Sequence, residues 1–445
     1  MLVDLLTAPL TPLLDRSELR RRLTVSGDTL PDLNNVPDWK IRSVVEGQLK
    51  GCYFPSEQDI DIALVILRRI VAHYNNTYST NTKYLEDLYS GKWSALEDVV
   101  PPICLTGPPG VGKSSLARAL ARLLPSADAI DIGSRHKIRI DTCWYKSIAG
   151  LDTPLGVCSS FGNGRVGQRN TTLQSVTRQN AEAAHRDCVG VVIVDEMQGM
   201  STSSTASTQL AKAITHVGMI GVPAVVIANY SACHKLLSRP QEQVDRLMMD
   251  SEILWPFLDG SSDWIEHLSQ TQATLGESLR INLSRDCDLL FNMTAGIRRY
   301  LRLILVNAYE FAWNGGRTWV TIDDLHSAYN DASKAPIRIA VDQAIKRLAS
   351  GTSRSKSFDS CPFPLPKVVS QTFRSVAQDI RSQDFSKAVY VATLPKSSND
   401  APQAPKKAME SISSPKRPKS RPKRRLTLEE QLEANAERKV RVKSH

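Results

Sequence analysis

The sequence predicts a three-layer α/β domain, in which helices cover both faces of a parallel sheet, followed by an α-helical lid and by flexible ends. Three short apolar runs predict the sheet. The first precedes a glycine-rich turn at residues 107–114. The second ends in Asp195 and Glu196, and the third ends in Asn229. Apolar runs of this length, separated by helical patterns, are typical of buried parallel strands.

The glycine-rich turn has the spacing of a phosphate-binding loop. It reads Gly-Pro-Pro-Gly-Val-Gly-Lys-Ser, which fits the pattern G-x-x-x-x-G-K-[ST]. The apolar run at residues 103–106 precedes it as a strand, and apolar residues at helical spacing follow it. Glycines let backbone N–H groups approach phosphate oxygens, and the helix N-terminus adds positive potential. The residues expected to bind a nucleotide here are Gly107, Pro108, Pro109, Gly110, Val111, Gly112, Lys113, Ser114 and Ser115.

Side chains of this loop and of the second run have separate roles in the expected chemistry. Lys113 is expected to reach the β- and γ-phosphates of ATP, and the hydroxyl of Ser114 to hold Mg²⁺. Asp195 is suited to holding the same ion, and Glu196 to polarising the water that attacks the γ-phosphate. A strand that simply runs into a loop would explain one acid but not this pair. No N-K-x-D stretch is present to bind guanine, so ATP is the expected nucleotide.

The third run, residues 222–228, ends in Asn229, and two interpretations of this residue fit. Its side chain positions the attacking water, or the residue only forms a turn. Taken in chain order, the loop, the Asp-Glu strand, the Asn-ended strand, a downstream arginine and a G-x-x-R helix resemble an AAA+ ATPase module over residues 53–332. In that resemblance Asn229 corresponds to the residue called sensor 1.

The resemblance also implies roles for two arginines. In "SRPQEQVDRLMMD", Arg246 corresponds to an arginine finger that acts on the nucleotide of a neighbouring subunit, with Arg239 as its rival. Such a residue contributes roughly 10³–10⁵ in rate. In "TAGIRRYLRLILVNAYEFAW", Gly296 and Arg299 fit the G-x-x-R of the lid helix. Arg299 therefore corresponds to sensor 2, and its neighbour Arg298 is the alternative.

Within the AAA+ ATPases, the chain resembles the TnsC/TniB-type regulators of multi-protein DNA transposons. Three phrases carry this resemblance: "YFPSEQDIDIALVILRRIVAHY", "VVIVDEMQGM" with the Ser/Thr-rich loop after it, and "GVPAVVIANYSA". The first begins with the cap signal Ser56-x-x-Asp59 before apolar residues at helical spacing, which predicts a helix. The chain departs from these regulators at Ala228-Asn229, where they commonly have Gly-Thr.

This resemblance implies a function in DNA transposition. ATP-bound subunits of such regulators assemble on double-stranded DNA as rings or filaments, connect a target-selecting protein to the transposase, and hydrolyse ATP to disassemble. Two other functions stay open: another AAA+ DNA-remodelling or loader ATPase, and an ATP-binding adaptor with negligible turnover. Glu196 argues against the adaptor, because a protein that only binds ATP has little use for a residue that polarises water.

The basic charge of the chain is concentrated near its C-terminus. The 445 residues carry a formal net charge of +10, and residues 396–425 contribute +8 of it, from ten Lys or Arg and two acids. Dense prolines predict an extended tail there, and "LTLEEQLEANAERKVRV" predicts a short helix after it. By resemblance, the tail is expected to contact transposase subunits, and its charge favours nonspecific DNA affinity. The N-terminal extension is a second expected docking segment, for a target-selecting protein.

A long insert between the first two runs carries the other candidate DNA contacts. It contains "GSRHKIRIDTCWYKSIAG" and "FGNGRVGQRNTTLQ". In an AAA+ ring this insert can face the central channel, with Trp144 buried; the alternative is that residues 162–167 form only a surface loop. The basic side chains expected to follow DNA phosphates are Arg135, Lys137, Arg139, Lys146, Arg165 and Arg169. Phosphate contacts carry no sequence information, so nonspecific DNA binding is expected.

These features divide the chain into five expected parts. They are an N-terminal extension at residues 1–50, the ATPase core with its helical lead-in at 51–250, the helical lid at 251–333, an appended segment at 334–395 and the basic tail at 396–445. No apolar run approaches the ~20 residues that span a bilayer. The eight cysteines are scattered singly without C-x-x-C pairs. The expected location is therefore the cytoplasm, and the expected assembly is an ATP-dependent homo-oligomer.

Overall fold

The computed structural model describes residues 2–90, 100–131, 137–161, 172–201, 205–350 and 359–393 of the chain. The chain divides into two units, Met1–Gln383 and Asp384–His445, and the sheet and the lid belong to the first. Three of the expected DNA contacts, Arg135, Arg165 and Arg169, lie outside the described residues, and so does the basic tail at residues 396–445.

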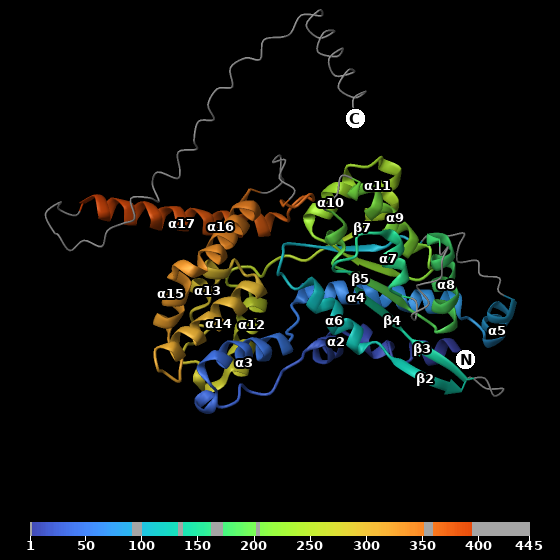
Figure 1. Cartoon of the computed structure of the whole chain (residues 1–445), viewed down its shortest axis with the longest axis horizontal. Coiled ribbons are helices and arrows are strands. Elements are labelled where there is room, and N and C mark those ends of the chain that lie inside the picture. The colour runs from blue at the N-terminus through green and yellow to red at the C-terminus, as the bar shows by residue number, and fades with distance from the viewer. Residues whose placement is uncertain are drawn as a thin grey trace, which may run out of the picture. The chain divides into compact units, whose positions relative to one another are not determined.

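The main sheet of the first unit has five parallel strands in the order β4-β5-β6-β1-β7 (Figure 1). These strands are β1 (Ile103–Thr106), β4 (Cys143–Ser147), β5 (Val191–Asp195), β6 (Ala224–Ile227) and β7 (Asp250–Ile253). The three predicted apolar runs are β1, β5 and β6. The predicted fold class, a parallel sheet between layers of helices, is confirmed.

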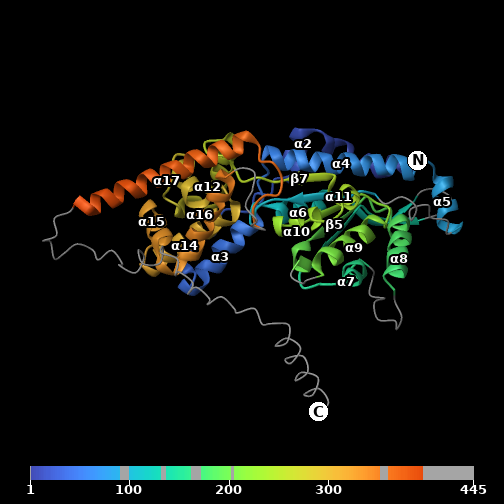
Figure 2. The same ribbon diagram turned by 90° about the horizontal axis from the view of Figure 1, so that it is seen from above.

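Side chains of the strands alternate between two apolar clusters, one on each face of the sheet, as the pleat of a strand requires. On β1, Leu105 belongs to one cluster and Cys104 to the other. Figure 2 shows α2 and α4 on one side of the sheet, and α7 and α9 on the other. The helices around the sheet are α2 (Arg16–Leu23), α4 (Glu57–Thr77), α6 (Lys113–Leu123), α7 (Pro154–Ser159), α8 (Leu173–Arg186), α9 (Ala206–Gly218) and α10 (Tyr230–Leu237).

A helical lid follows the sheet and has an apolar cluster of its own. Its helices are α12 (Ser262–Leu275), α13 (Cys287–Thr294), α14 (Arg298–Asn314), α15 (Ile322–Asn330), α16 (Ala335–Ala349) and the part of α17 (Lys367–Thr393) up to Gln383. α14 packs against α13 and α15, and it buries the predicted face that contains Leu301 and Leu305. Val341 of α16 and Phe373 of α17 lie in the same cluster, so residues of the appended segment are part of the lid core.

The first fifty residues are folded, which corrects the expectation of a flexible N-terminal end. Leucines of α1 (Leu2–Thr7), of α2 and of the turn between them pack in the cluster that also contains α4 and β1. These leucines are Leu2, Leu6, Leu10, Leu13, Leu19 and Leu23. α3 (Asp38–Gly51) packs instead in the lid cluster, through Ile41 and Val45. The prolines and arginines of this segment lie between buried leucines, and the leucines determine its structure.

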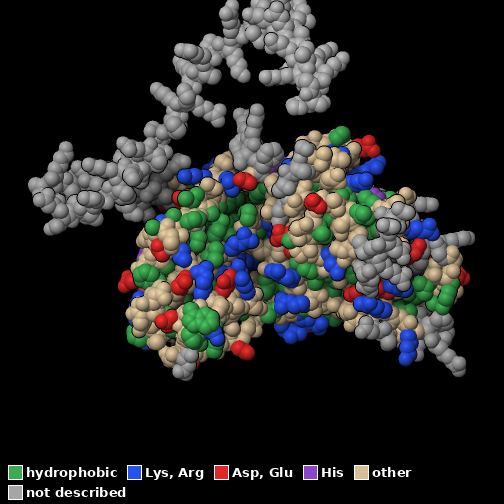
Figure 3. All heavy atoms as spheres, in the orientation of Figure 1, with side chains coloured by type: hydrophobic (Ala, Val, Ile, Leu, Met, Phe, Trp, Pro, Cys, Tyr) green, Lys and Arg blue, Asp and Glu red, His purple; other side chains and the backbone are tan. Residues whose placement is uncertain are grey.

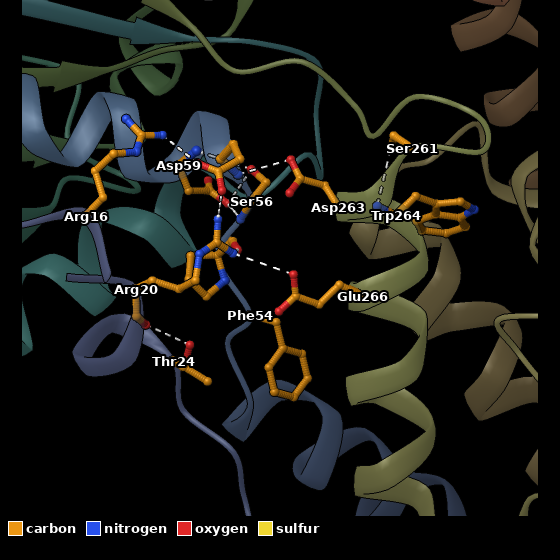
Figure 4. A network of polar contacts seen from close by, with 12 residues as sticks. Arg16, Arg20, Thr24, Phe54, Ser56, Asp59, Ser261, Asp263, Trp264 and Glu266 are labelled. Atoms are coloured by element: carbon orange, nitrogen blue, oxygen red, sulfur yellow. Dashed lines mark hydrogen bonds and ion pairs between the residues drawn. The ribbon is translucent and has the colours of Figure 1, made fainter. Parts of the chain in front are cut away.

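The N-terminal segment passes from the core to the lid and back again. Val25 lies where the chain leaves the core after α2, and Tyr53 lies where it returns before α4. These two residues form an antiparallel β-bridge. Charged side chains connect the N-terminal segment, the core and the lid (Figure 4). Arg20 of α2 donates to Glu57 of α4 at 2.5 Å, and it lies 3.8 Å from Glu266 of α12. The predicted cap of α4 is confirmed, because the backbone N–H of Ser56 donates to Asp59 at 2.8 Å.

Several elements were not predicted from the sequence. β7 continues the sheet to Ile253, past residue 250, where the boundary of the core was expected. A separate antiparallel hairpin is formed by β2 (Ser126–Asp131) and β3 (Lys137–Asp141). The remaining elements are α5 (Asn81–Ser90), α11 (Gln241–Met248) and 3₁₀ turns at Thr11–Leu14, Leu33–Asn35, Met197–Ser201, Gly276–Ser278 and Ala332–Lys334. Over the described ranges, no helix combines the length and the apolar character needed to cross a membrane.

Candidate nucleotide-binding site

The ends of β1, β5 and β6 bring the predicted site residues together. Because β6 pairs in parallel with β5 on one side and β1 on the other, the carboxyl ends of all three strands meet at one edge of the sheet. A pocket of about 270 Å³ opens there. Its wall consists of Pro109, Gly110, Gly112, Lys113, Ser114, Ser115, Arg118, Asp195, Glu196, Ile227, Asn229, Arg298, Arg299 and Arg302.

The phosphate-binding loop has a backbone conformation that requires glycine. Gly107 has a φ of 152°, and a Cβ there would collide with the carbonyl oxygen of Leu254. Two other predicted loop residues lie behind the pocket wall: Val111 is buried, and Pro108 contributes a carbonyl oxygen to the lysine of the loop. α6 begins at that lysine, so its N-terminus faces the pocket.

Lys113 is buried beneath the loop. Its Nζ donates to the carbonyl oxygens of Gly107 at 2.8 Å and Pro108 at 3.1 Å. Burial lowers the pKa of Lys113 to about 8, because the charged form loses hydration. Among the described residues, no carboxylate forms an ion pair with it. A phosphate in the pocket would supply the missing negative charge.

Ser114 and Asp195 meet where the sequence predicts Mg²⁺. The Ser114 hydroxyl donates to Oδ1 of Asp195 at 3.1 Å, and Asp195 is only 3% exposed. The hydroxyl of Tyr145, on β4, donates to Oδ2 of the same carboxylate at 2.8 Å. Burial and then this bond raise the pKa of Tyr145, so it stays a donor. Hydroxyl and carboxylate oxygens are the hard ligands that Mg²⁺ prefers, so Ser114 and Asp195 fit this ion.

Glu196 has an unusual backbone conformation. Its φ of 67° lies in the left-handed region, which residues other than glycine seldom adopt. Its N–H donates to Oδ1 of Asp195 at 2.8 Å, which holds the turn after β5. Strained backbone of this kind is concentrated at functional sites and motivates a functional hypothesis for Glu196.

Asn229 lines the pocket at the end of β6, between the two strands that carry the loop and the acids. It is the N-cap residue of α10, yet its side chain makes no capping hydrogen bond. The interpretation of Asn229 as a residue that forms a turn therefore lacks the side-chain bond by which asparagine usually stabilises one.

The two neighbouring lid arginines have different surroundings. Arg298 forms a buried ion pair with Asp59 and donates to the carbonyl oxygen of Val111 at 3.0 Å. Arg299 has no such partner in the described chain, and its backbone N–H donates to the carbonyl oxygen of Gly110 at 3.2 Å. Gly296 allows this approach, since it has a φ of 64° and a Cβ there would collide with the carbonyl of Phe257. Both arginines line the pocket, but only Arg298 is already neutralised.

Sequence reasoning missed three side chains of this site. Arg118 of α6 and Arg302 of α14 line the pocket, and Tyr145 holds Asp195. Arg302 follows Arg299 by three residues, a spacing that places both on one face of a helix and was a usable signal. No local motif identifies Tyr145, because its contact with Asp195 depends on the pairing of β4 with β5.

The rival arginines Arg246 and Arg239 both lie outside the pocket wall of their own chain. Arg246, on α11, has a side chain that is 72% exposed, and among the described residues it pairs only with Glu242 of the same helix. Arg239 is partly buried and donates to Gln243 at 2.5 Å and to Ser207 at 3.2 Å. Arg246 is therefore the more accessible to a neighbouring subunit.

The described basic residues of the insert lie on two strands. Lys137 and Arg139 are exposed on β3, and Lys146 is exposed at the end of β4. Trp144, expected to be buried, is partly buried and stacks on Phe161 with ring centroids 6.0 Å apart. Figure 3 shows further Lys and Arg side chains gathered near the positions of α2 and α6 in Figure 1.

A family model matches the part of the chain that contains the phosphate-binding loop. Residues 101–236 match the family model of the AAA domain, which is less than a third of the chain. No curated protein matches the sequence. Similar solved structures include the ORC1 protein of Aeropyrum pernix in complex with DNA, with a TM-score of 0.38 and 16% identity over 60% of this chain. This chain spans 64% of that protein's length.

Two other solved structures show similarity at the same level. Cdc6p of Pyrobaculum aerophilum gives a TM-score of 0.39 and 13% identity, over 69% of this chain and 83% of that one. The RuvB Holliday junction branch migration motor of Thermotoga maritima gives a TM-score of 0.31 and 13% identity. The match covers 56% of this chain and 68% of that one. The sheet order and the phosphate-binding loop are those of an AAA+ P-loop fold, and residues 101–236 of this fold match the AAA domain model.

Proposed function

We propose that this chain binds and hydrolyses ATP at the pocket between the strand ends and the lid. One observation carries the proposal. Four segments far apart in the sequence, which contain Lys113, Asp195, Asn229 and Arg299, line one pocket. Their side chains are a phosphate-binding cation, a metal-binding carboxylate, a neutral hydrogen-bonding amide and a second cation, which together suit a nucleoside triphosphate.

Each side chain has a role in this proposal. Lys113 binds the β- and γ-phosphates, and the backbone of the loop surrounds them. Ser114 and Asp195 hold Mg²⁺, which supplies charge neutralisation to the phosphates when bound. Glu196 takes a proton from the attacking water, and Asn229 orients that water. Arg299 binds the terminal phosphate from the lid side as sensor 2, because Arg298 is already paired with Asp59.

Complete hydrolysis requires a second copy of the chain in this proposal. Arg246 acts as the arginine finger on the nucleotide of a neighbouring subunit. Its exposed side chain and its absence from the pocket of its own chain support this role. Arg239 is the weaker candidate, since moving it would break its bonds to Gln243 and Ser207. The resulting assembly is an ATP-dependent homo-oligomer.

At the level of the whole protein, we propose an ATP-dependent regulator of DNA transposition. The resemblance of three phrases of the sequence to TnsC/TniB-type regulators, within an AAA+ resemblance over residues 53–332, supports this function. Exposed Lys137, Arg139 and Lys146 support nonspecific contact with the backbone of double-stranded DNA. The basic tail at residues 396–445 is proposed to bind transposase subunits, and the folded N-terminal segment to bind a target-selecting protein.

The experiment that tests the ATPase proposal compares two pocket variants with matched surface controls. Lys113→Ala should lose ATP binding and assembly, whereas Glu196→Gln should keep binding, lose roughly 10²–10⁴ in turnover and stabilise assemblies on DNA. Lys212→Ala and Glu182→Gln change exposed or partly exposed residues of α9 and α8 and should behave as wild type. Binding, turnover and sedimentation with duplex DNA are measured together. Wild-type turnover in Glu196→Gln would overturn the assignment.

Deletion of residues 396–445 tests the transposition proposal. The truncated chain should keep ATP binding and turnover but lose capture of purified transposase. DNA binding is measured across a salt series, because each neutralised phosphate contributes about −0.9 to the log–log slope. Intact transposase capture with lost DNA binding would instead make the tail a DNA tether. If no oligomer forms in the presence of nucleotide and DNA, the proposed function as a transposition regulator is wrong.

A further inference from the structure

Arg302 is a charged side chain for which the described chain provides no partner. It lies on α14 and lines the nucleotide pocket. Its Nε is shielded from solvent and makes no hydrogen bond. No ion pair to a described carboxylate accompanies it. A partly buried guanidinium without a counter-charge is costly, and such a group in a folded protein calls for an explanation.

The surroundings of Arg302 add to this cost. Arg299 and Arg118, which share its pocket, are also cationic, and both act to lower the pKa of Arg302 after the larger effect of burial. The acid that acts on it most is Glu46 of α3, whose carboxylate is already paired with Lys50 at 2.8 Å. Among the described residues, no carboxylate is therefore left to form an ion pair with Arg302.

Arg298 of the same helix also has a buried Nε without a hydrogen bond, but its charge is neutralised. It has Asp59 as a buried counter-charge and a carbonyl oxygen of the loop as a second partner. Apart from Arg298, four cationic side chains face two carboxylates in the pocket wall. The four are Lys113, Arg118, Arg299 and Arg302, and the two are Asp195 and Glu196. This excess of positive charge suits a polyanion.

We propose that Arg302 contacts the terminal phosphate of a bound nucleoside triphosphate together with Arg299, and so makes the lid favour triphosphates over diphosphates. The inference deepens the proposed ATPase function and rests on it. Two residues with charged side chains three positions apart on one helix face can bind one phosphate group from the same side.

The position of its neighbours assigns Arg302 to the terminal phosphate. Arg118 and Arg302 line the same pocket wall as Asp195 and Glu196, the acids at the end of β5. The backbone of Arg299 is bonded to Gly110 of the loop, which fixes the start of α14 beside the phosphate-binding loop. Arg302 is thus beside the residues expected to act on the γ-phosphate.

The test measures the affinity of the full chain for a non-hydrolysable ATP analogue and for ADP. Arg302→Ala should weaken the ATP analogue roughly tenfold to a hundredfold, as expected for a lost charged hydrogen bond, and should change ADP affinity little. Arg302→Lys should recover part of the preference, because it restores the charge but not the planar group. Arg285→Ala, an exposed lid arginine outside the pocket wall, is the matched control.

Each outcome decides between the two proposals. Equal weakening of both nucleotides, or no change in either, would overturn the role of Arg302 while leaving the ATPase proposal intact. Failure of the wild-type chain to bind any nucleotide would overturn the ATPase proposal and this inference with it. Arg302→Gln keeps a polar side chain that can donate hydrogen bonds, but it removes the charge. It gives the same comparison if the alanine variant unfolds.

Discussion

The nucleotide pocket has two sides that are held in place in different ways. On the strand side, Lys113, Asp195 and Asn229 follow directly from β1, β5 and β6, whose backbones are hydrogen-bonded to one another. On the lid side, every pocket residue belongs to α14. The first turn of α14 is fastened to the core by the bond from Arg299 to Gly110 and by the contacts of Arg298.

This difference indicates which part of the site can respond to the nucleotide. Strand ends in a continuous parallel sheet cannot move separately without breaking ladder hydrogen bonds. A helix joined to the core by a few contacts can change position when a ligand contacts it differently. In the proposed ATPase, we therefore expect the hydrolysis chemistry on the strand side and the discrimination between triphosphate and diphosphate on the lid side.

The largest expected effect comes from breaking the buried contact between the two sides. Arg298→Met removes the counter-charge of Asp59, a residue with no exposed surface. Removing one partner of a buried ion pair typically costs about 3–5 kcal/mol, because the other charge is left unpaired. Asp59 keeps its capping bonds to Ser56, and the substitution removes the bond to the carbonyl oxygen of Val111 together with the ion pair, so the loss reports both contacts. Denaturant unfolding measures it.

The control for this experiment is an exposed ion pair within one helix. Glu182→Ala breaks the pair of Arg178 and Glu182 on α8, whose N–O distance is 3.1 Å. Exposed pairs contribute about 0–1 kcal/mol, so this variant should unfold almost as wild type does. If Arg298→Met also costs less than about 1 kcal/mol, the lid is not held to the core by this pair.

A smaller effect is expected on the strand side, at the residue that holds the metal-binding carboxylate. Tyr145→Phe removes one donor from Asp195 and keeps the ring. Loss of a residue that orients a metal ligand typically costs roughly 10–100-fold in metal affinity or activity. The Mg²⁺ concentration needed for half-maximal nucleotide binding should rise accordingly, with Tyr329→Phe in the lid as control. An unchanged Mg²⁺ requirement would show that Asp195 is positioned without Tyr145.

The strand side of this comparison is also the part that the sequence predicts well. The phosphate-binding loop and its two flanking elements follow from local spacing, and the structure has β1 at the predicted residues. Arg298 and Arg299 could not be separated from the sequence, because their difference depends on Asp59, which is far away in the chain. Tyr145 was missed for the same reason, whereas Arg302 had a local signal in its spacing from Arg299. The N-terminal leucines were not predicted to be buried, because prolines and arginines interrupt their spacing.

The smallest effect is expected where the N-terminal segment joins the core to the lid. Arg20 lies between Glu57 of α4 and Glu266 of α12, and both acids have side chains more than half exposed (Figure 4). Arg20→Ala should therefore destabilise the fold by about 1 kcal/mol or less. Because salt screens exposed charges, the difference from wild type should shrink between about 0.05 M and 1 M salt. Arg21→Ala is the control, because Arg21 pairs with Glu18 of the same helix and its ion pair does not connect the core to the lid. Unfolding curves at both salt concentrations measure the effect. If the loss of stability persists at high salt, the packing of the arginine stem, and not its charge, joins the lid to the core.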